Sequence, residues 1–166
     1  MSEPIIQIQI DEEYQGLVEA DWLASIARQT LELEQIATPA EVSLVITGQD
    51  TVRQLNRDYR GLDEPTDVLS FALTETRGRK RKFALPPDGV LRLGDVIISY
   101  PQAAAQAAER GDPTDREVAL LVVHGVLHLL GYDHMKPDEE KIMQAKERAA
   151  LERVFPVTAE WSPERE

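Results

Sequence analysis

Three histidines lie close together in the second half of the chain, at a spacing that could bind one metal ion. They are the only histidines among the 166 residues and fall within the segment 124–134, HGVLHLLGYDH. His124 and His128 are four residues apart, which places both imidazoles on the same face of a helix. Gly131 can adopt the left-handed backbone that ends a helix, so the chain can turn and bring His134 back toward the pair. The spacing therefore predicts a metal site with ligands His124, His128 and His134.

The ligand type indicates the metal and its role. Three neutral imidazoles suit Zn²⁺ and leave one position of a tetrahedral ion open, as in catalytic zinc sites. Other divalent transition metals also accept imidazole ligands. Cysteine is absent, which excludes disulfides and thiolate metal sites. We expect one catalytic Zn²⁺; the alternative, that these are ordinary core or surface histidines, leaves their spacing unexplained.

The same spacing raises the alternative of a zinc peptidase. The pattern H-x-x-x-H-x-x-G-x-x-H matches the metzincin motif in its ligands and its glycine. Gly125, however, stands where that motif has its general-base Glu. Without this carboxylate, peptide hydrolysis lacks the group that activates water and delivers a proton to the leaving amine. The substitution argues against a peptidase.

The elements that must position these residues follow from hydrophobic periodicity. Ile6, Ile8 and Ile10 alternate with glutamines, the pattern of a half-buried strand. Strands are predicted over 6–10, 42–46, 68–73 and 96–100, and helices over 21–35, 50–59, 101–110, 115–130 and 138–154. Asp21 and Asp50 are placed as helix caps, and Thr114 with Glu117 forms a capping-box pattern. The helix 115–130 is apolar on nearly all sides, which is typical of a buried central helix.

This order of elements predicts one α+β (mixed α/β) domain over residues 1–166. We expect a small mixed four-stranded sheet flanked by five to six helices. The length of 166 residues and the hydrophobic fraction of 42% allow one core without disulfides. The N-terminus has no signal-peptide pattern, and the longest apolar run, 118–130, is too short to cross a bilayer. We expect a cytoplasmic protein that does not bind membranes.

Charge is unevenly distributed along the chain. The net charge of −12 argues against non-specific coating of nucleic acid, since that affinity comes mostly from Lys and Arg. Between positions 51 and 92, nine basic residues face six acidic ones, so this segment carries +3 and the remainder −15. The tract from Arg77 to Lys82 could contact an RNA backbone, although such charge runs are more often exposed loop tips.

With its neighbours, HGVLHLLGYDH resembles the signature of the YbeY family of bacterial endoribonucleases. Three further motifs in the same order are similar to those of the family: Tyr59-Arg60-Gly61, PTDVLSF at 65–71 and LGDVII at 93–98. Together they span residues 59–134, a little under half of the chain. Asp67 stands where many members carry Asn, and RGRKRK at 77–82 looks like an insertion. Neither difference touches the predicted ligands.

The resemblance implies metal-dependent endonucleolytic cleavage of single-stranded RNA. It implies a role in rRNA processing, notably at the 3′ end of 16S rRNA, and in ribosome quality control. The implied partners are rRNA in the ribosome or its small subunit, ribosomal proteins and ribosome-assembly GTPases. The implied fold is a mixed α/β sheet with flanking helices, distantly similar to metalloproteinases. The alternatives are a zinc-dependent peptidase and a non-catalytic ribosome-assembly factor with a structural metal.

Arg60 and His124 are the residues that we expect to take part in catalysis. A guanidinium can bind two phosphate oxygens at once, and the resemblance assigns Arg60 to the active site. On composition alone Arg60 would be an ordinary surface arginine. Asp133 precedes the third ligand and could orient an imidazole N–H or simply form a turn. The sequence leaves open whether the metal activates water or polarises the phosphate for attack by the RNA 2′-OH.

Overall fold

One mixed sheet organises the computed structural model, which describes residues 4–36, 39–73, 89–133 and 135–156. Its strands are β1 (Ile5–Ile10), β2 (Ala40–Thr47), β3 (Val68–Ala72) and β4 (Leu91–Ser99). The α-helices are α1 (Ala20–Leu33), α2 (Gln49–Arg60), α3 (Tyr100–Arg110), α4 (Thr114–Leu129) and α5 (Pro137–Val154), with a 3₁₀ turn at Glu12–Tyr14. The sheet order is β1-β2-β4-β3, with β3 antiparallel to β4 and the other pairings parallel. The predicted mixed α/β fold with a four-stranded sheet is confirmed.

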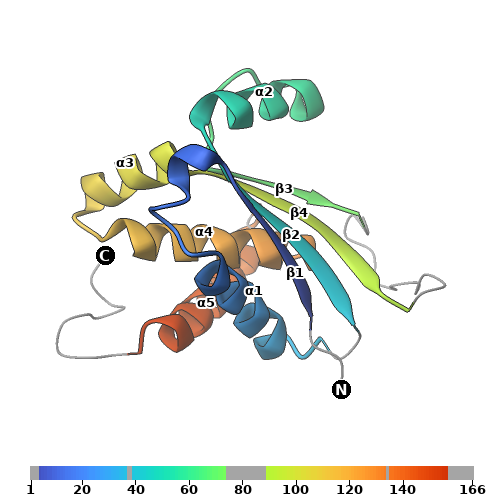
Figure 1. Cartoon of the computed structure of the whole chain (residues 1–166). Coiled ribbons are helices and arrows are strands. Elements are labelled where there is room, and N and C mark those ends of the chain that lie inside the picture. The colour runs from blue at the N-terminus through green and yellow to red at the C-terminus, as the bar shows by residue number, and fades with distance from the viewer. Residues whose placement is uncertain (1–3, 37–38, 74–88, 134, 157–166) are drawn as a thin grey trace.

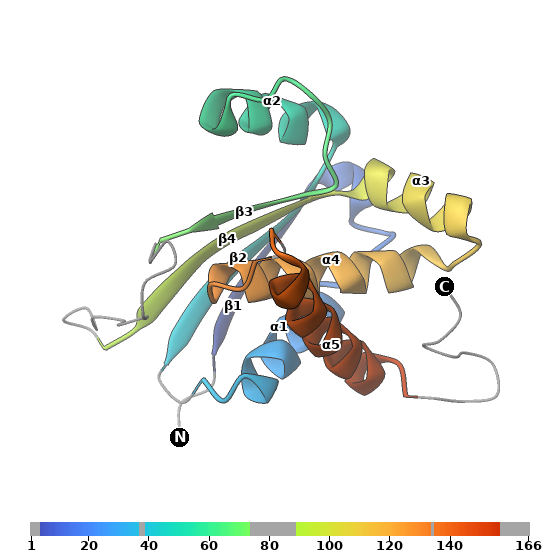
Figure 2. The same ribbon diagram turned by 180° about the vertical axis from the view of Figure 1, so that it is seen from behind.

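The helices lie on both faces of the sheet. Figures 1 and 2 show α1, α4 and α5 on one face and α2 by itself on the other. The alternation of β2 decides the core face, because Val42, Leu44 and Ile46 are all fully buried. Ile6, Ile8 and Ile10 of β1 are half-buried and pack against this core, as their alternation predicts. The hydrophobic interior therefore lies between the sheet and the helices α1, α4 and α5.

Helix α4 runs through the middle of that interior. Eleven of its 16 residues are buried, including Val118, Val122 and Val126. Each such side chain contributes about 1.5–3 kcal/mol when it is fully buried. The sheet, α1, α3 and α5 all pack on α4. The helix that carries the histidine pair is thus held on several sides.

Several predicted helix starts are wrong by one or two residues. Helix α1 begins at Ala20 and α2 at Gln49, so Asp21 and Asp50 lie in the first turn and cap nothing. Their carboxylates still favour the positive end of the helix dipole. Thr114 is the first residue of α4, behind Pro113, and the capping box does not form. The carboxylate of Glu117 instead accepts hydrogen bonds from Gln106 and Arg110, both at 2.8 Å.

The fourth strand is also longer than predicted. β4 begins at Leu91, five residues before the predicted start, and ends at Ser99, while Tyr100 already belongs to α3. Arg92 and Gly94 interrupt the apolar run and obscured the first half of the strand. Pairing with β2 makes this half a strand nonetheless. In the described part of the chain, no helix combines the length and the apolar character needed to cross a membrane.

Candidate metal centre

The imidazoles of His124 and His128 converge on the same side of α4, as their spacing predicts. Their Nε2 atoms are 3.0 Å apart, and the rings stand at 75° to each other with centroids 4.5 Å apart. Two nitrogens bound to one tetrahedral zinc ion would lie about 3.3 Å apart. Both side chains are partly accessible to solvent. The pair therefore presents two nitrogen donors at a spacing close to that of a shared metal ion.

A carboxylate from α5 supports His124 from behind. Nδ1 of His124 lies 2.5 Å from Oε2 of Glu147, whose side chain is only 14% exposed. A carboxylate accepts, so Nδ1 carries the proton, and in the neutral ring Nε2 keeps its lone pair. This is the arrangement in which an outer carboxylate orients a metal-binding histidine. Sequence reasoning missed Glu147. Asp133, which was considered for such a role, lies two residues after Gly131, and that role stays a prediction.

Replacing this carboxylate tests its contribution to metal binding. Glu147→Gln is expected to weaken zinc binding about tenfold, because it removes the negative charge that fixes the His124 tautomer. The affinity is measured by competition with a chelating dye. Glu140→Gln, an exposed position on the same helix, is the matched control and should bind zinc like the unchanged chain. Equal affinities of the two variants would show that Glu147 has no such role.

The turn after α4 forms as its glycine predicts. Gly131 has φ 102°, a backbone conformation that residues other than glycine rarely adopt. Its N–H donates to the carbonyl of His128 at 3.0 Å, and the N–H of Tyr132 donates to the carbonyl of Leu127 at 3.1 Å. These two bonds make up a Schellman motif, which ends the helix and reverses the chain. The segment leading to His134 therefore leaves α4 by a defined turn.

A polar network holds this turn against two helices. The hydroxyl of Tyr132 donates to Oε1 of Glu34 at 2.5 Å, and Nζ of Lys146 donates to Oε2 of the same carboxylate at 2.9 Å. Burial and the hydrogen bond to Glu34 raise the pKa of Tyr132. The hydrogen bond to Glu34 also raises the pKa of Lys146. The turn is thereby tied to the end of α1 and to α5.

Gly125 lies where α4 packs closely against Val96 of β4. A Cβ at this position would lie 2.4 Å from Cγ1 of Val96 and 3.0 Å from its Cγ2. The position therefore faces β4, where Val96 is fully buried. Gly125 is required for close packing of the helix on the strand, and a side chain here would point into the core.

The third predicted ligand, His134, lies outside the described residues. Among the residues that are described, no group of three metal-binding side chains comes together. The structure thus places two of the three predicted ligands together. The donor set fits zinc, because both nitrogens belong to imidazoles and one of them is oriented by a carboxylate.

Arg60 is the last residue of α2 and is exposed. Helix α2 lies on the face of the sheet opposite α4 (Figures 1 and 2). No contact between described residues brings Arg60 to the histidine pair, so its catalytic role stays a prediction. The basic tract of residues 77–82 lies outside the described residues.

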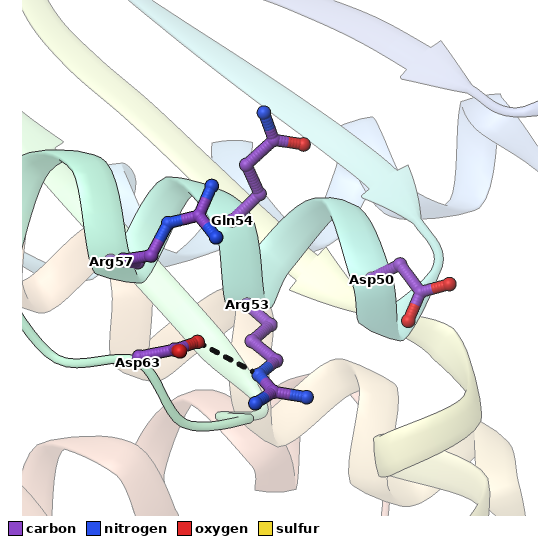
Figure 3. A pocket seen from close by; sticks show the side chains of 5 residues that line it. All are labelled: Asp50, Arg53, Gln54, Arg57 and Asp63. Carbon is purple, nitrogen blue, oxygen red and sulfur yellow. Dashed lines mark hydrogen bonds and ion pairs between the residues drawn. The ribbon is translucent and has the colours of Figure 1, made fainter.

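A shallow pocket on the outer face of α2 contains two further arginines. Figure 3 shows its lining, which is Asp50, Arg53, Gln54, Arg57 and Asp63, around a volume of about 240 Å³. Nε of Arg53 pairs with Asp63 at 2.9 Å, and Nε of Arg57 pairs with Asp58 at 3.3 Å. All four side chains are about half exposed. Because neighbouring carboxylates offset both cations, this pocket is a weak candidate for an anion site.

The structure is a mixed sheet covered by a central helix, and that helix carries a histidine pair supported by a carboxylate. These features define a mixed α/β protein with a candidate metal centre. The family model described as endoribonuclease YbeY matches residues 6–154. The chain belongs to this family.

Individual relatives agree with that assignment. Proteins named endoribonuclease YbeY from Roseiflexus castenholzii and Dehalococcoides mccartyi are 45% and 42% identical to the chain, each covering 90% of it and 92% of the relative. The relative from Chloroflexus aurantiacus is 45% identical, with 88% and 92% covered. A solution structure of a Thermotoga maritima protein is similar with TM-score 0.62 at 25% identity, covering 91% of this chain and 89% of that one.

Proposed function

We propose that this protein is a metal-dependent endoribonuclease that cleaves single-stranded RNA. The observation that carries the proposal is the convergence of the His124 and His128 Nε2 atoms, 3.0 Å apart, with Glu147 behind His124. The relatives named endoribonuclease YbeY support RNA as the substrate. From the family motifs we further propose action in rRNA processing, at the 3′ end of 16S rRNA, and in ribosome quality control. The proposed partners are the small ribosomal subunit, ribosomal proteins and assembly GTPases, in the cytoplasm.

Each residue of the proposed site has a distinct part. His124, His128 and His134 would hold one Zn²⁺, and Glu147 would keep the proton of His124 on Nδ1. The ion would supply Lewis-acid stabilisation of charge on the phosphoryl oxygens. Arg60 would bind the phosphate next to the cleaved bond. Of the three arginines on α2, Arg60 alone has no ion pair among the described residues, so its guanidinium is available to a phosphate.

The proposal is tested with two substrates and a chelator. Purified protein with measured zinc content is incubated with a synthetic RNA carrying the 16S 3′-end sequence, once single-stranded and once annealed to its complement. We expect cleavage of the single strand only, loss of cleavage with chelator and recovery with added Zn²⁺. Casein is the parallel substrate for the peptidase alternative. Uncleaved RNA at full zinc content would contradict the proposal and favour the non-catalytic assembly factor.

The peptidase alternative meets a specific obstacle in the structure. The motif position that supplies the general base in zinc peptidases is Gly125, and it faces Val96 in the core. No carboxylate can act on a substrate from there. We therefore favour phosphodiester cleavage. In that reaction, a metal ion can promote attack by the oxygen nucleophile without a carboxylate at this position.

A further inference from the structure

A second pocket lies between α2 and the outer face of the sheet, away from the histidine pair. Its lining is Leu55 and Tyr59 of α2, Phe71 of β3, and Asp95 and Ile97 of β4. Its volume of about 390 Å³ falls within the range of small-molecule sites, roughly 300–1,000 Å³. Figures 1 and 2 show α2 lying over β3 and β4 on this side. The proposed chemistry does not use these residues.

Two aromatic rings form one side of the pocket. Tyr59 and Phe71 meet edge to face, with centroids 5.6 Å apart and an angle of 65° between the rings. Tyr59 is nevertheless 73% exposed, so its ring is available to a ligand. An exposed aromatic ring is a common stacking surface for an unpaired nucleobase, because every base has a flat π-face.

Asp95 adds a polar group to this apolar lining. It is half-buried, and within the described ranges its carboxylate makes no hydrogen bond or ion pair, whereas its backbone pairs with β2 and β3. A carboxylate accepts hydrogen bonds and does not donate them, so it selects a ligand with N–H groups. Guanine offers two adjacent donors, N1–H and the N2 amino group, which match the two oxygens of a carboxylate. Adenine and cytosine offer an amino group, whereas uracil offers only an imino N–H.

The pocket and the histidine pair lie on opposite faces of the same edge strand. Oγ of Ser70 donates to the carbonyl of Gly125 at 3.3 Å, beside His124. Phe71 is the next residue and therefore points to the other face of β3. No further strand pairs with β3 in the described sheet. The pocket is therefore separated from the histidine pair by this edge strand.

We propose that this pocket binds one unpaired base of the RNA substrate, stacked on Tyr59 and hydrogen-bonded to Asp95. A base with an amino group is preferred over uracil, and guanine binds best. The inference rests on the proposed function, since it takes RNA as the substrate. It adds a site that recognises a base on the face of the sheet opposite the histidine pair.

The pocket is tested first with free nucleosides. Guanosine, cytidine and uridine are titrated into the full chain, and the ring proton resonances of Tyr59 and Phe71 are followed by NMR. We expect the largest shifts with guanosine and the smallest with uridine, and loss of this order in Asp95→Asn. An arginine-rich peptide is titrated in parallel. Shifts with the peptide and none with any nucleoside would overturn the proposal and point to a protein ligand.

The second test measures affinity for a short fluorescent single-stranded RNA in the presence of chelator, where cleavage is suppressed. Tyr59→Ala should bind about 5- to 100-fold more weakly, whereas Tyr59→Phe, which keeps the ring, should bind like the unchanged chain. Gln54→Ala, on the opposite face of α2, is the matched control. Circular dichroism verifies that each variant is folded. Equal RNA affinity of Tyr59→Ala and Gln54→Ala would overturn the proposal that this pocket binds a base. The proposed cleavage activity is measured separately with zinc and would not be affected by that result.

Discussion

His128→Ala is expected to abolish both zinc retention and RNA cleavage. Loss of an outer hydrogen-bonding partner already weakens metal sites 10- to 100-fold, so loss of a direct ligand should weaken zinc binding more than about 100-fold. Cleavage should fall below about 1% of that of the unchanged chain at equal zinc concentration. Zinc content is measured by elemental analysis, and cleavage is measured on the single-stranded 16S 3′-end RNA.

The fold should survive this substitution, which makes the result interpretable. His128 is only partly buried, and the Schellman bonds after it use its backbone and not its ring. Asp115→Asn, at an exposed position on the same helix, is the matched control and should keep its zinc and its activity. A His128→Ala protein with a full equivalent of zinc and normal cleavage would remove His128 from the site. In the presence of chelator, both variants should bind RNA with unchanged affinity, because the pocket beside Tyr59 is separate from the metal site.

Gly125→Glu should prevent stable folding. The new side chain would start 2.4 Å from Val96 and carry a carboxylate into the core, where no described side chain is placed to neutralise it. Steric overlap and burial of an unpaired charge together should cost more than about 4 kcal/mol. Domains of this kind are stable by only about 5–15 kcal/mol. Urea unfolding followed by circular dichroism measures the loss.

A graded pair of variants separates the steric cause from the charge. Gly125→Ala should cost about 1–3 kcal/mol from overpacking, offset by about 1 kcal/mol because alanine favours the helix. Val96→Ala in the same chain removes the opposing methyl groups, so the two changes together should cost less than their sum by about 1 kcal/mol or more. A folded Gly125→Glu protein that cleaves casein with zinc would instead restore the peptidase alternative.

The parts of the site that depend only on local geometry could be predicted from the sequence. The four-residue spacing of the histidines and the glycine turn depend on hydrogen bonds within a few residues, which the sequence displays directly. Helix starts were less certain: Asp21, Asp50 and Thr114 all lie inside their helices. A residue that favours a helix start can be recognised in the sequence. The exact position at which the helix begins depends on where the preceding strand or loop ends.

The sequence by itself determined the fold class, the central helix and the histidine pair, because periodicity and spacing are local properties. Tertiary structure decided which distant side chains meet those residues. Glu147 is one of five carboxylates on α5, and only the packing of Met143, Ala150 and Leu151 brings it to His124. The placement of Asp95 beside Tyr59 likewise depends on α2 crossing the outer face of the sheet. Such contacts arise from how buried surfaces fit together over long separations, which no short pattern in the chain records.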